Sequence, residues 1–431
     1  MYFLYDIALY LATPMILVYC LYSSWRKGWR REGIAERFGI YDAGMLSALD
    51  GQKTIWVHAV SVGETIAVMP LLKGLKAVFP ERKIVLSNGT ETGHKVALTL
   101  NEADLCIYFP FDFRFAVRRL LELIHPSLIL VVETEIWPNF LRTAREMGIP
   151  VVMVNGRISD RSFGSYLRLR WFFSRILSDY ARFCMQTCED ARRIVAMGAP
   201  PDRVEVTKNI KYDLPVASFS PTEKQDIRSS FHIPPGVSVV TTGSTHEGED
   251  ETVISVYRRL LAEGRELFLI LAPRHPERVP QVAELLRREG VPFTLRSKLD
   301  GRSGLFRAGE LLLVDTVGEL MRFYTVSDVA FVGGSLVPTG GHNVLEPASL
   351  RVPVLFGPHM NNFREAASLI LAYGGGLQVR DGEELATVLG TLLDDEAKRR
   401  AMGDSGARLM EENSGSTLLH LRVVECLLEG H

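Results

Sequence analysis

The stretch TIWVHAVSVGETIAVMPLLKGLKAVF, residues 54–79, carries the pattern that decides the fold. Residues 54–60 form a short apolar run of the length of a buried strand, and residues 64–79 have apolar side chains at helical spacing. Only a short turn, Ser61-Val62-Gly63, separates the two segments. A strand followed at once by a helix predicts one unit of a parallel sheet that is covered by helices.

The same pattern recurs along the chain in two sets. The first set adds expected strands at 83–87, 127–132 and 150–155. A helix is expected after the turn 88–94, and residues 133–139 follow the strand at 127–132 with a strand-to-helix turn. The second set has expected strands at 238–242, 266–272, 311–315, 328–332 and 352–356. The periodicity lapses near residues 208–221, so we place a domain boundary there. The sequence therefore predicts an α/β chain of two Rossmann-like domains.

Size and composition agree with a globular protein of this kind. The chain has 431 residues, of which 47% are apolar and 23% charged, with a formal net charge of -2. This charge argues against a general nucleic-acid binder, which needs an excess of Lys and Arg to neutralise phosphates. The five cysteines contain no CxxC pair. They indicate reduced thiols and a cytosolic body.

The N-terminal segment is unusually apolar. Residues 2–22 carry one charge, Asp6, and as a helix they would cover roughly 30 Å. An aromatic and cationic flank follows: Trp25, Arg26, Lys27, Trp29, Arg30 and Arg31. We expect residues 1–31 to be a membrane anchor whose flank stays on the cytoplasmic side. Because Asp6 and Pro14 interrupt the run, a true span and an in-plane helix remain open, and the alternative to both is a helix buried on the domain.

Two acidic turns follow expected strands of the first domain. Glu64 lies in the first turn of its helix, where the helix dipole should keep the carboxylate ionised and suited to act as a base. Glu133 and Glu135 follow the strand at 127–132, so the two turns should converge at the carboxyl edge of the sheet. Lys211, near the domain boundary, can supply a cation to the same place. The alternative for each carboxylate is a capping or ion-pairing role, and for Lys211 an ordinary surface position.

The second domain carries a glycine-rich turn and an arginine after a strand. Residues 333–343, GGSLVPTGGHN, lead into a helix with Glu346, an arrangement that lets backbone amides approach a phosphate and a carboxylate accept bonds from a ribose. Arg274 follows the strand at 266–272 and can bind phosphate oxygens with its guanidinium. A plain tight connection is the alternative for the glycine-rich turn. The string STHEGE, residues 244–249, lacks a metal-ligand spacing and predicts a polar helix start.

A segment rich in arginine and aromatic residues lies at 157–182. Its arginines are interleaved with Phe163, Tyr166, Trp171, Phe172 and Phe173. Such a surface can bind an anionic, partly apolar acceptor. It can equally be a solvated amphipathic helix whose arginine stems cover apolar surface.

Seven strings, in this order, resemble the Kdo transferases, which attach 3-deoxy-D-manno-oct-2-ulosonic acid (Kdo) to lipid A precursor. They are HAVSVGE (58–64), VVETEIWPN (131–139), NIKYD (209–213), STHEGE (244–249), APRHPER (272–278), FVGGSLVPTGGHN (331–343) and LEPA (345–348). The resemblance runs from near the first residue to the last. Pro338-Thr339 varies inside the glycine-rich turn and leaves the shape of that loop open, whereas Glu64, Glu133 and Lys211 show no departure.

The resemblance implies a GT-B fold, two Rossmann-like domains facing a central cleft, and an inverting transfer of Kdo from CMP-Kdo to lipid A precursor (lipid IVA) in lipopolysaccharide synthesis. Residues 32–210 would form the acceptor-side domain and 211–431 the domain that binds the CMP-sugar. The enzyme would work at the cytoplasmic face of the cell inner membrane, with no cofactor, metal or nucleic acid.

The resemblance also implies roles for individual residues. Glu64 would accept the proton of the acceptor hydroxyl, and Glu133 and Lys211 would stabilise the transition state. The residues that would hold CMP are Pro273, Arg274, Val317, Gly318, Glu319, Asn343, Val344, Leu345 and Glu346. Two alternatives remain open at this point: another GT-B nucleotide-sugar transferase or epimerase, and a membrane-docked nucleotide-sugar binding module without catalysis.

Overall fold

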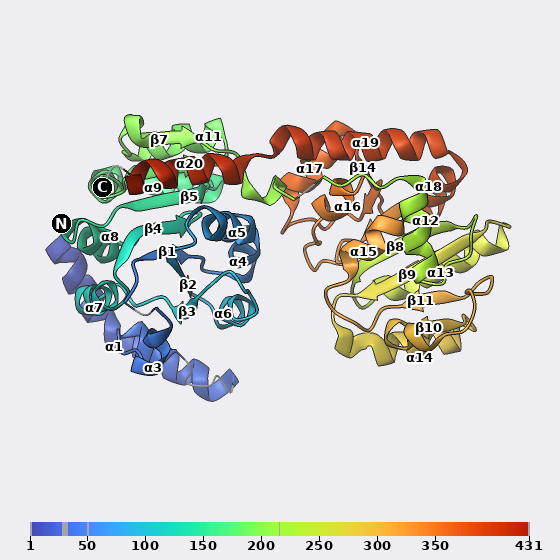
Figure 1. Cartoon of the computed structure of the whole chain (residues 1–431), viewed down its shortest axis with the longest axis horizontal. Coiled ribbons are helices and arrows are strands. Elements are labelled where there is room, and N and C mark those ends of the chain that lie inside the picture. Colours follow the sequence, from blue (N-terminus) through green and yellow to red (C-terminus); the bar gives the residue numbers. More distant parts are fainter. Residues whose placement is uncertain (1, 28–32, 50, 215, 430–431) are drawn as a thin grey trace. The chain divides into compact units, whose positions relative to one another are not determined.

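The computed structural model describes residues 2–27, 33–49, 51–214 and 216–429, which divide into two compact units (Figure 1). Unit 1 contains residues 1–213 and 414–431, and unit 2 contains residues 214–413. Each unit is built on one parallel sheet with seven strands among the described residues. The α/β class and the two-domain organisation predicted from the sequence are confirmed.

In unit 1 the strand order is β3-β2-β1-β4-β5-β6-β7. The strands are β1 (Thr54–His58), β2 (Lys83–Asn88), β3 (Leu105–Tyr108), β4 (Pro126–Val132), β5 (Val151–Gly156), β6 (Arg182–Met185) and β7 (Val204–Val206). The helices are α1 (Tyr2–Lys27), α2 (Ile34–Arg37), α3 (Ala43–Leu46), α4 (Val62–Ala67), α5 (Met69–Val78), α6 (Glu91–Ala97), α7 (Arg114–Ile124), α8 (Pro138–Glu146), α9 (Asp160–Arg168), α10 (Arg170–Leu177), α11 (Cys188–Met197) and α20 (Ser416–Glu429). The described part of the unit also contains the short 3-10 helices η1 (Ser47–Leu49), η2 (Pro201–Arg203) and η3 (Ile210–Tyr212).

In unit 2 the strand order is β10-β11-β9-β8-β12-β13-β14. The strands are β8 (Ser238–Thr245), β9 (Leu267–Pro273), β10 (Phe293–Leu295), β11 (Leu311–Leu313), β12 (Val329–Val332), β13 (Val354–Phe356) and β14 (Gly376–Gln378). The helices are α12 (Pro221–Ser230), α13 (Glu249–Ala262), α14 (Val279–Arg288), α15 (Leu320–Val326), α16 (Leu345–Ser349), α17 (Arg364–Tyr373), α18 (Gly382–Asp394) and α19 (Glu396–Asn413), with the 3-10 helices η4 (Pro276–Arg278) and η5 (Arg296–Gly301).

The sheets are buried on both faces, which explains the apolar strand runs of the sequence. In β1, Trp56 belongs to one core cluster and its neighbours Ile55 and Val57 belong to another, because successive side chains of a strand point to opposite faces. In unit 2, Leu269 and Ile270 of β9 divide between two clusters in the same way. The chain direction in both sheets places the turns after the central strands at one edge, where ligands of such folds bind.

Helix α20 corrects the predicted domain division. The sequence prediction assigned residues 211–431 to the second domain, whereas residues 414–431 belong to unit 1. Leu421 and Val424 of α20 lie in the core cluster beneath β1, and α20 packs on α5. Gly74 allows this contact, because a Cβ there would lie 2.7 Å from Leu421. The apolar face of α20 is therefore matched to unit 1, which a reading of chain order did not reveal.

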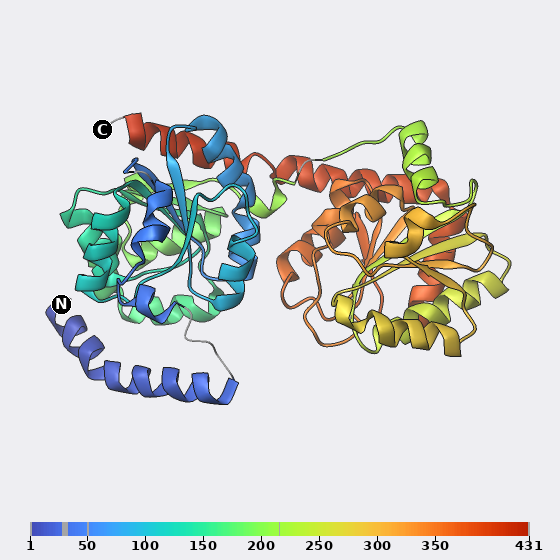
Figure 2. The same cartoon turned by 60° about the horizontal axis from the view of Figure 1, so that its bottom comes forward.

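Helix α1 begins at Tyr2 and lies along one side of unit 1 (Figure 2). Asp6, the single charge of its apolar run, accepts a hydrogen bond of 2.6 Å from Asn139 Nδ2, and the hydroxyl of Tyr5 donates to Asp112 at 2.9 Å. Among the described residues, no helix has the length and apolar character needed to cross a membrane. Of the predicted flank, Trp25, Arg26 and Lys27 end α1, whereas Trp29, Arg30 and Arg31 lie outside the described residues. Of the two forms of membrane anchor that the sequence left open, the spanning helix is therefore not supported.

Candidate active site

Two strands at the centre of the unit 1 sheet end in acidic residues. β1 pairs with β4. The sheet extends from β1 through β2 to β3 on one side and from β4 through β5 and β6 to β7 on the other, so the chain changes sides between β1 and β4. Such a switch point is where open α/β sheets bind ligands, because the connecting turns diverge there. Glu64 follows β1 and Glu133 follows β4. The predicted convergence of the two acidic turns is confirmed.

Glu64 is fixed by the start of α4. Ser61 caps the helix, its hydroxyl donates to Glu64 Oε1 at 2.8 Å, and the backbone N–H of Val60 donates to Glu64 Oε2 at 2.7 Å. Burial raises the pKa of Glu64, the hydrogen bonds from Val60 and Ser61 lower it, and the charge of Glu133 raises it further. The sequence led us to expect that the helix dipole keeps this group ionised. Burial acts in the opposite direction and favours proton binding, as a base requires.

Glu133 and Lys211 form an ion pair next to this carboxylate. Lys211 Nζ lies 3.6 Å from Glu133 Oε1, and both side chains are partly exposed. The structure thus brings together the three residues predicted to be catalytic. Glu133 has a φ of 58°, a left-handed conformation that costs a non-glycine residue free energy and that occurs often at functional sites. A partly exposed ion pair contributes only about 0–1 kcal/mol to stability. The strain at Glu133 therefore fits a functional position better than a stabilising one.

Glu135, in the same turn as Glu133, is the third carboxyl group of this cluster. Its Oε2 accepts a hydrogen bond of 2.9 Å from Trp137 Nε1, and its backbone oxygen accepts one of 2.5 Å from the Tyr180 hydroxyl. Burial, and next the charge of Glu64, raise the pKa of Glu135 to about 7. Glu135 therefore titrates near neutral pH while interacting with Glu64. The sequence predicted a strand-to-helix turn at this place, and α8 begins after it, at Pro138.

An apolar cavity of about 390 Å³ is lined by two residues, Val60 and Trp137, that contact this acidic cluster. Its walls include Leu9 and Thr13 of α1, Phe109 and Phe111 after β3, and Val60 and Trp137. The last two residues also hydrogen-bond Glu64 and Glu135. Pockets that hold small ligands usually measure about 300–1,000 Å³. The cavity is thus large enough to bind part of a ligand beside Glu64.

In unit 2 the glycine-rich turn after β12 is held by a buried carboxylate. Glu249, fully buried at the start of α13, accepts hydrogen bonds from the backbone N–H groups of Gly334 (2.6 Å), Ser335 (2.9 Å) and Leu336 (2.8 Å). The sequence predicted that amides of this turn contact a phosphate. The amides of Gly334, Ser335 and Leu336 are already occupied by Glu249, and that of Gly333 by Gly243 O, so any phosphate contact must come from later residues of the turn.

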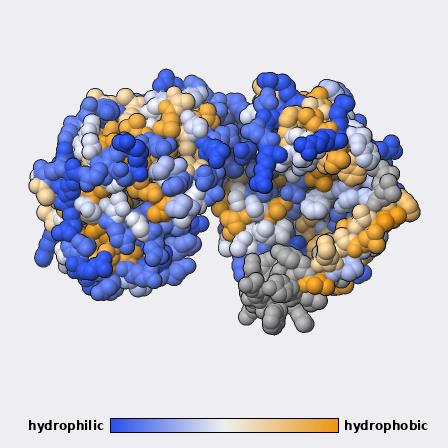
Figure 3. Space-filling model, turned by 180° about the vertical axis from the view of Figure 1, so that it is seen from behind, coloured by the Kyte–Doolittle hydropathy of each residue, from blue (hydrophilic) through white to orange (hydrophobic). Residues whose placement is uncertain are grey.

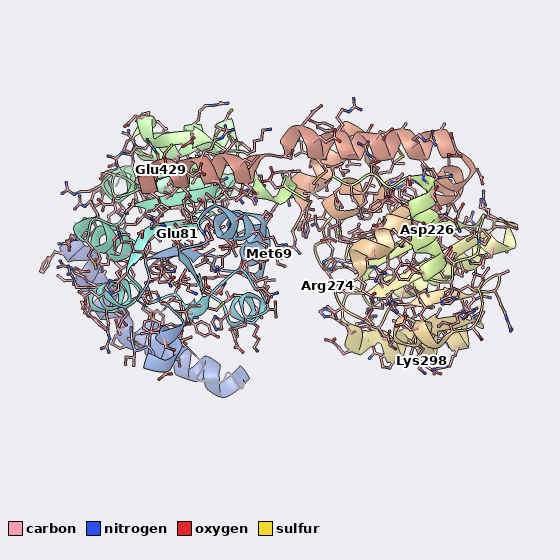
Figure 4. All side chains as sticks on the ribbon, in the orientation of Figure 1. Met69, Glu81, Asp226, Arg274, Lys298 and Glu429 are labelled. Atoms are coloured by element: carbon pink, nitrogen blue, oxygen red, sulfur yellow. The ribbon has the colours of Figure 1, made fainter. Side chains whose placement is uncertain are left out.

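Arg274 and Glu346 lie at the same sheet edge. The backbone N–H of Arg274 donates to Thr245 O at 3.0 Å, which ties the turn after β9 to the end of β8. Arg274 is exposed at the margin of unit 2 (Figure 4), and within the described residues no hydrogen bond or ion pair of its guanidinium is recorded. Glu346 accepts a bond of 3.2 Å from Asn343 Nδ2, and burial raises its pKa while Arg274 lowers it. Both groups are suited to the expected phosphate and ribose contacts.

The other residues predicted to hold CMP differ in which of their groups are free to contact a ligand. The Glu319 carboxylate is bound by Thr316 Oγ1 at 2.6 Å and by Arg296 at 2.9 Å, and the hydrogen bonds and the positive charge of Arg296 and Arg322 lower its pKa despite the opposing effect of burial. It fixes its own turn, where Val317 is 83% exposed and Gly318 has a φ of 88°. Pro273 ends β9, while Val344 and Leu345 are buried in the core. The last two can contact a ligand only through their backbone.

Comparison with known proteins decides the family. Residues 32–214 match the family model described as 3-deoxy-D-manno-octulosonic-acid transferase (kdotransferase). The chain is 33% identical over 429 residues to the 3-deoxy-D-manno-octulosonic acid transferase of Haemophilus influenzae, covering 99% of both chains. It is 32% identical over 434 residues to the enzyme of that name from Bordetella pertussis, covering 98% of both. The chain belongs to the Kdo transferase family.

The Kdo transferase fold is also found in more distant solved structures. The UDP-GlcNAc 2-epimerase of Neisseria meningitidis matches with a TM-score of 0.56 and 14% identity, over 86% of this chain and 100% of that one. A glycosyltransferase from Rickettsia africae matches with a TM-score of 0.54 and 13% identity, over 88% and 100%. At these identities the likeness concerns the fold alone, and it agrees with a GT-B architecture. As a Kdo transferase, the chain is a glycosyltransferase.

Sequence reasoning missed three features of this Kdo transferase. Glu135 was seen only as part of an acidic turn, although Trp137 two residues later was a signal for a partner. Glu249 was read as a polar helix start, and nothing in the sequence indicated that it reaches the turn at 334–336. The close contact of His246 with His342 likewise joins positions 96 residues apart. Among the described residues, no group of His, Cys, Asp and Glu side chains has a geometry that could hold a metal ion.

Proposed function

We propose that this Kdo transferase moves Kdo from CMP-Kdo to a lipid A precursor (lipid IVA), with inversion at the anomeric carbon, at the cytoplasmic face of the inner membrane. The observation that carries the proposal is the cluster of Glu64, Glu133 and Lys211 at the switch point of unit 1. Family membership supplies the reaction class, and this cluster supplies groups suited to perform it.

In the proposed reaction, the acceptor hydroxyl forms a bond to the anomeric carbon of Kdo while the bond from that carbon to the phosphate oxygen of CMP breaks. Glu64 takes the hydroxyl proton, for which its raised pKa suits it. Positive charge that develops on the sugar is stabilised by Glu133, which Lys211 keeps in place. Arg274 compensates the negative charge that the CMP phosphate gains on leaving.

A lipid acceptor is supported by two apolar features of unit 1. The outer side of α1 exposes Phe3, Ile7, Leu11, Met15 and Val18, which form a hydrophobic band along the described part of the helix (Figure 3). The inner side of the same helix lines the cavity beside Glu64. We propose that α1 lies in the plane of the membrane, with its outer face among the lipids, and that acyl chains of the acceptor enter the cavity.

The alternative of a different GT-B enzyme, a nucleotide-sugar transferase or epimerase, is disfavoured by the comparison of identities. The epimerase likeness rests on 14% identity, whereas the Kdo transferase relatives cover almost the whole chain at more than twice that identity. The alternative of a binding module without catalysis is disfavoured because three interacting titratable groups lie at the switch point. Such coupled groups are typical of catalytic sites.

Incubation of the protein with CMP-Kdo and lipid IVA, followed by mass spectrometry of the lipid, tests the proposal. We expect the lipid to gain the mass of one or more Kdo residues, and the activity to persist in EDTA. Transfer of a hexose from a UDP-sugar without transfer from CMP-Kdo would show that the donor is assigned wrongly. Loss of activity in EDTA with rescue by a divalent ion would show that a metal takes part.

A further inference from the structure

Three histidine rings meet at the ligand-binding edge of the unit 2 sheet. His246 follows β8, His275 follows β9, and His342 belongs to the glycine-rich turn after β12. His246 Nε2 lies 2.9 Å from His342 Nε2, and these two rings are stacked with their centroids 5.1 Å apart. The His275 ring stands perpendicular to that of His246 at 5.6 Å. The strings STHEGE, APRHPER and GGHN each contribute one ring.

The buried Glu249 fixes the positions of the two loops that carry His246 and His342. Besides the amides of the glycine-rich turn, it accepts a hydrogen bond of 3.0 Å from the backbone N–H of His246. One carboxylate thus fixes both loops that carry the stacked pair. Gly334 makes room for the pair, because a Cβ at this position would lie 2.9 Å from the His342 ring. The arrangement is therefore built by the fold and does not depend on two mobile surface side chains.

The contact between the Nε2 atoms of His246 and His342 limits how many protons these two atoms can carry. A hydrogen bond between two imidazole nitrogens needs one N–H donor and one bare nitrogen, so the pair shares a single proton between these atoms. Burial and the positive charge of Arg274 lower the pKa of His342 to about 4, and burial also lowers the pKa of His246. The isolated pair is thus neutral at physiological pH. An anion bound against it would favour the uptake of a further proton.

The charged groups around the pair are two positive side chains, Arg274 and Arg278, and two negative ones, Glu249 and Asp250. Besides the rings themselves, Arg274, Arg278 and Glu249 face the pair. Arg278 is neutralised by Asp250 at 2.7 Å, and Glu249 is occupied by backbone amides. Arg274 therefore remains as the charge that is available to a ligand. An anion is the ligand class that this surrounding favours.

We propose that His246, His275 and His342, together with Arg274, form a subsite for the carboxylate of the acidic sugar in the donor. This inference rests on the proposed function. In a 2-ulosonic acid activated as CMP-Kdo, the carboxylate and the phosphate oxygen are attached to the same carbon, so the site must receive two neighbouring anions. Arg274 supplies one charge for both, and the histidine pair supplies the second by taking up a proton as the carboxylate binds.

Calorimetric titration of CMP and of CMP-Kdo, without acceptor, tests the subsite, because CMP carries the phosphate but lacks the sugar carboxylate. His246→Gln and His342→Gln should each weaken CMP-Kdo binding about tenfold or more, the usual effect of losing a charge-assisted hydrogen bond. Binding of CMP should stay within about twofold in both variants, which also shows that unit 2 is folded. His125→Asn, at an exposed left-handed position of unit 1, is the matched control and should change neither.

Proton uptake gives an independent readout. Titration of the wild-type protein in buffers with different ionisation enthalpies should show protons taken up with CMP-Kdo and not with CMP, and affinity for CMP-Kdo should fall as the pH rises. Equal losses for CMP and CMP-Kdo in the variants would assign the rings to the phosphate, and unchanged binding of both would remove them from the site. Either result would overturn the subsite while Kdo transfer by the wild type remained intact. Absence of that transfer would instead refute the proposed function.

Discussion

The side chain of Glu64 has the capping role that the sequence presented as one of two alternatives, and the proposed function adds the other. It completes the cap of α4 with Ser61, and it lies with Glu133 at the sheet edge, where the proposed reaction needs a base. The cap could be predicted from the spacing of Ser61 and Glu64, and the convergence with Glu133 from the parallel sheet. The direction of the Glu64 pKa shift could not be predicted, because it depends on burial and on charged residues that are distant in the sequence.

Glu64→Gln should lower kcat roughly 100- to 10,000-fold, because an amide cannot accept the proton. The variant should fold normally. The amide oxygen of Gln can still accept a hydrogen bond from Val60 N–H, and its NH2 group can donate to the Ser61 hydroxyl, which donates to Glu64 in the wild type. Kdo transfer rates and thermal unfolding check both expectations. Turnover within about threefold of the wild type would remove Glu64 from the role of base.

Glu135 should shape the acid side of the pH profile. A base works only when it is deprotonated, and the negative charge of a neighbouring carboxylate raises its pKa. Glu135→Gln removes such a charge from beside Glu64, so the acid limb of kcat/KM should move to lower pH. The pH dependence of kcat/KM in the free enzyme measures this shift. An acid limb that stayed in place, or moved to higher pH, would mean that the two groups do not interact in catalysis.

Among the helices and strands, α1 shows that an apolar run in the sequence does not decide between a membrane anchor and a helix attached to the domain. Its length suggested an anchor, and Asp6 looked like an interruption, whereas the structure uses Asp6 and Tyr5 to attach the helix to unit 1. The contacts lie more than 100 residues away in sequence, at Asn139 and Asp112, so no local pattern could reveal them. The short strands β3, β6, β7, β10 and β14 were also missed, whereas β11, β12 and β13, which have the same length of three or four residues, were predicted.

Substitution on the outer face of α1 tests its proposed place in the membrane. Leu11→Glu combined with Met15→Glu should lower binding to phospholipid vesicles roughly tenfold or more, because burial of each apolar side chain contributes about 1.5–3 kcal/mol. Transfer to a detergent-solubilised acceptor should change little. Leu418→Glu, at an exposed apolar position of α20, is the control. Equal vesicle binding of the variant and the wild type would contradict an in-plane helix.

Glu249 links helix α13 to the glycine-rich turn, and its removal should affect both. Glu249→Ala leaves buried amides without acceptors, which should lower the free energy of unfolding by about 3 kcal/mol or more. Glu247→Ala, an exposed neighbour, should change it by less than about 0.5 kcal/mol. Urea unfolding followed by circular dichroism measures both. Equal stabilities of the two variants would show that the turn does not depend on Glu249.

For the whole molecule, the sequence predicted two α/β domains and a boundary within 208–221, and the chain passes from unit 1 to unit 2 after Asp213. The return of residues 414–431 to unit 1 was missed, since an amphipathic C-terminal helix fits either domain by pattern. Its place is settled by buried contacts, among them His420 Nε2, which accepts a bond of 3.0 Å from Asn155 N–H. The family resemblance predicted the site residues in both units, while the structure shows which of their polar groups are already occupied.

The central claim is that this chain transfers Kdo with Glu64 as the base. The most direct measurement compares wild type, Glu64→Gln and a no-enzyme control in a reaction of CMP-Kdo with lipid IVA, with mass spectrometry of the lipid product. We predict that the lipid gains the mass of Kdo with the wild type, whereas the initial rate with the variant, corrected for the control, is lower by about 100-fold or more while the variant still binds CMP. No gain with the wild type, or equal gains with both proteins, would contradict the account.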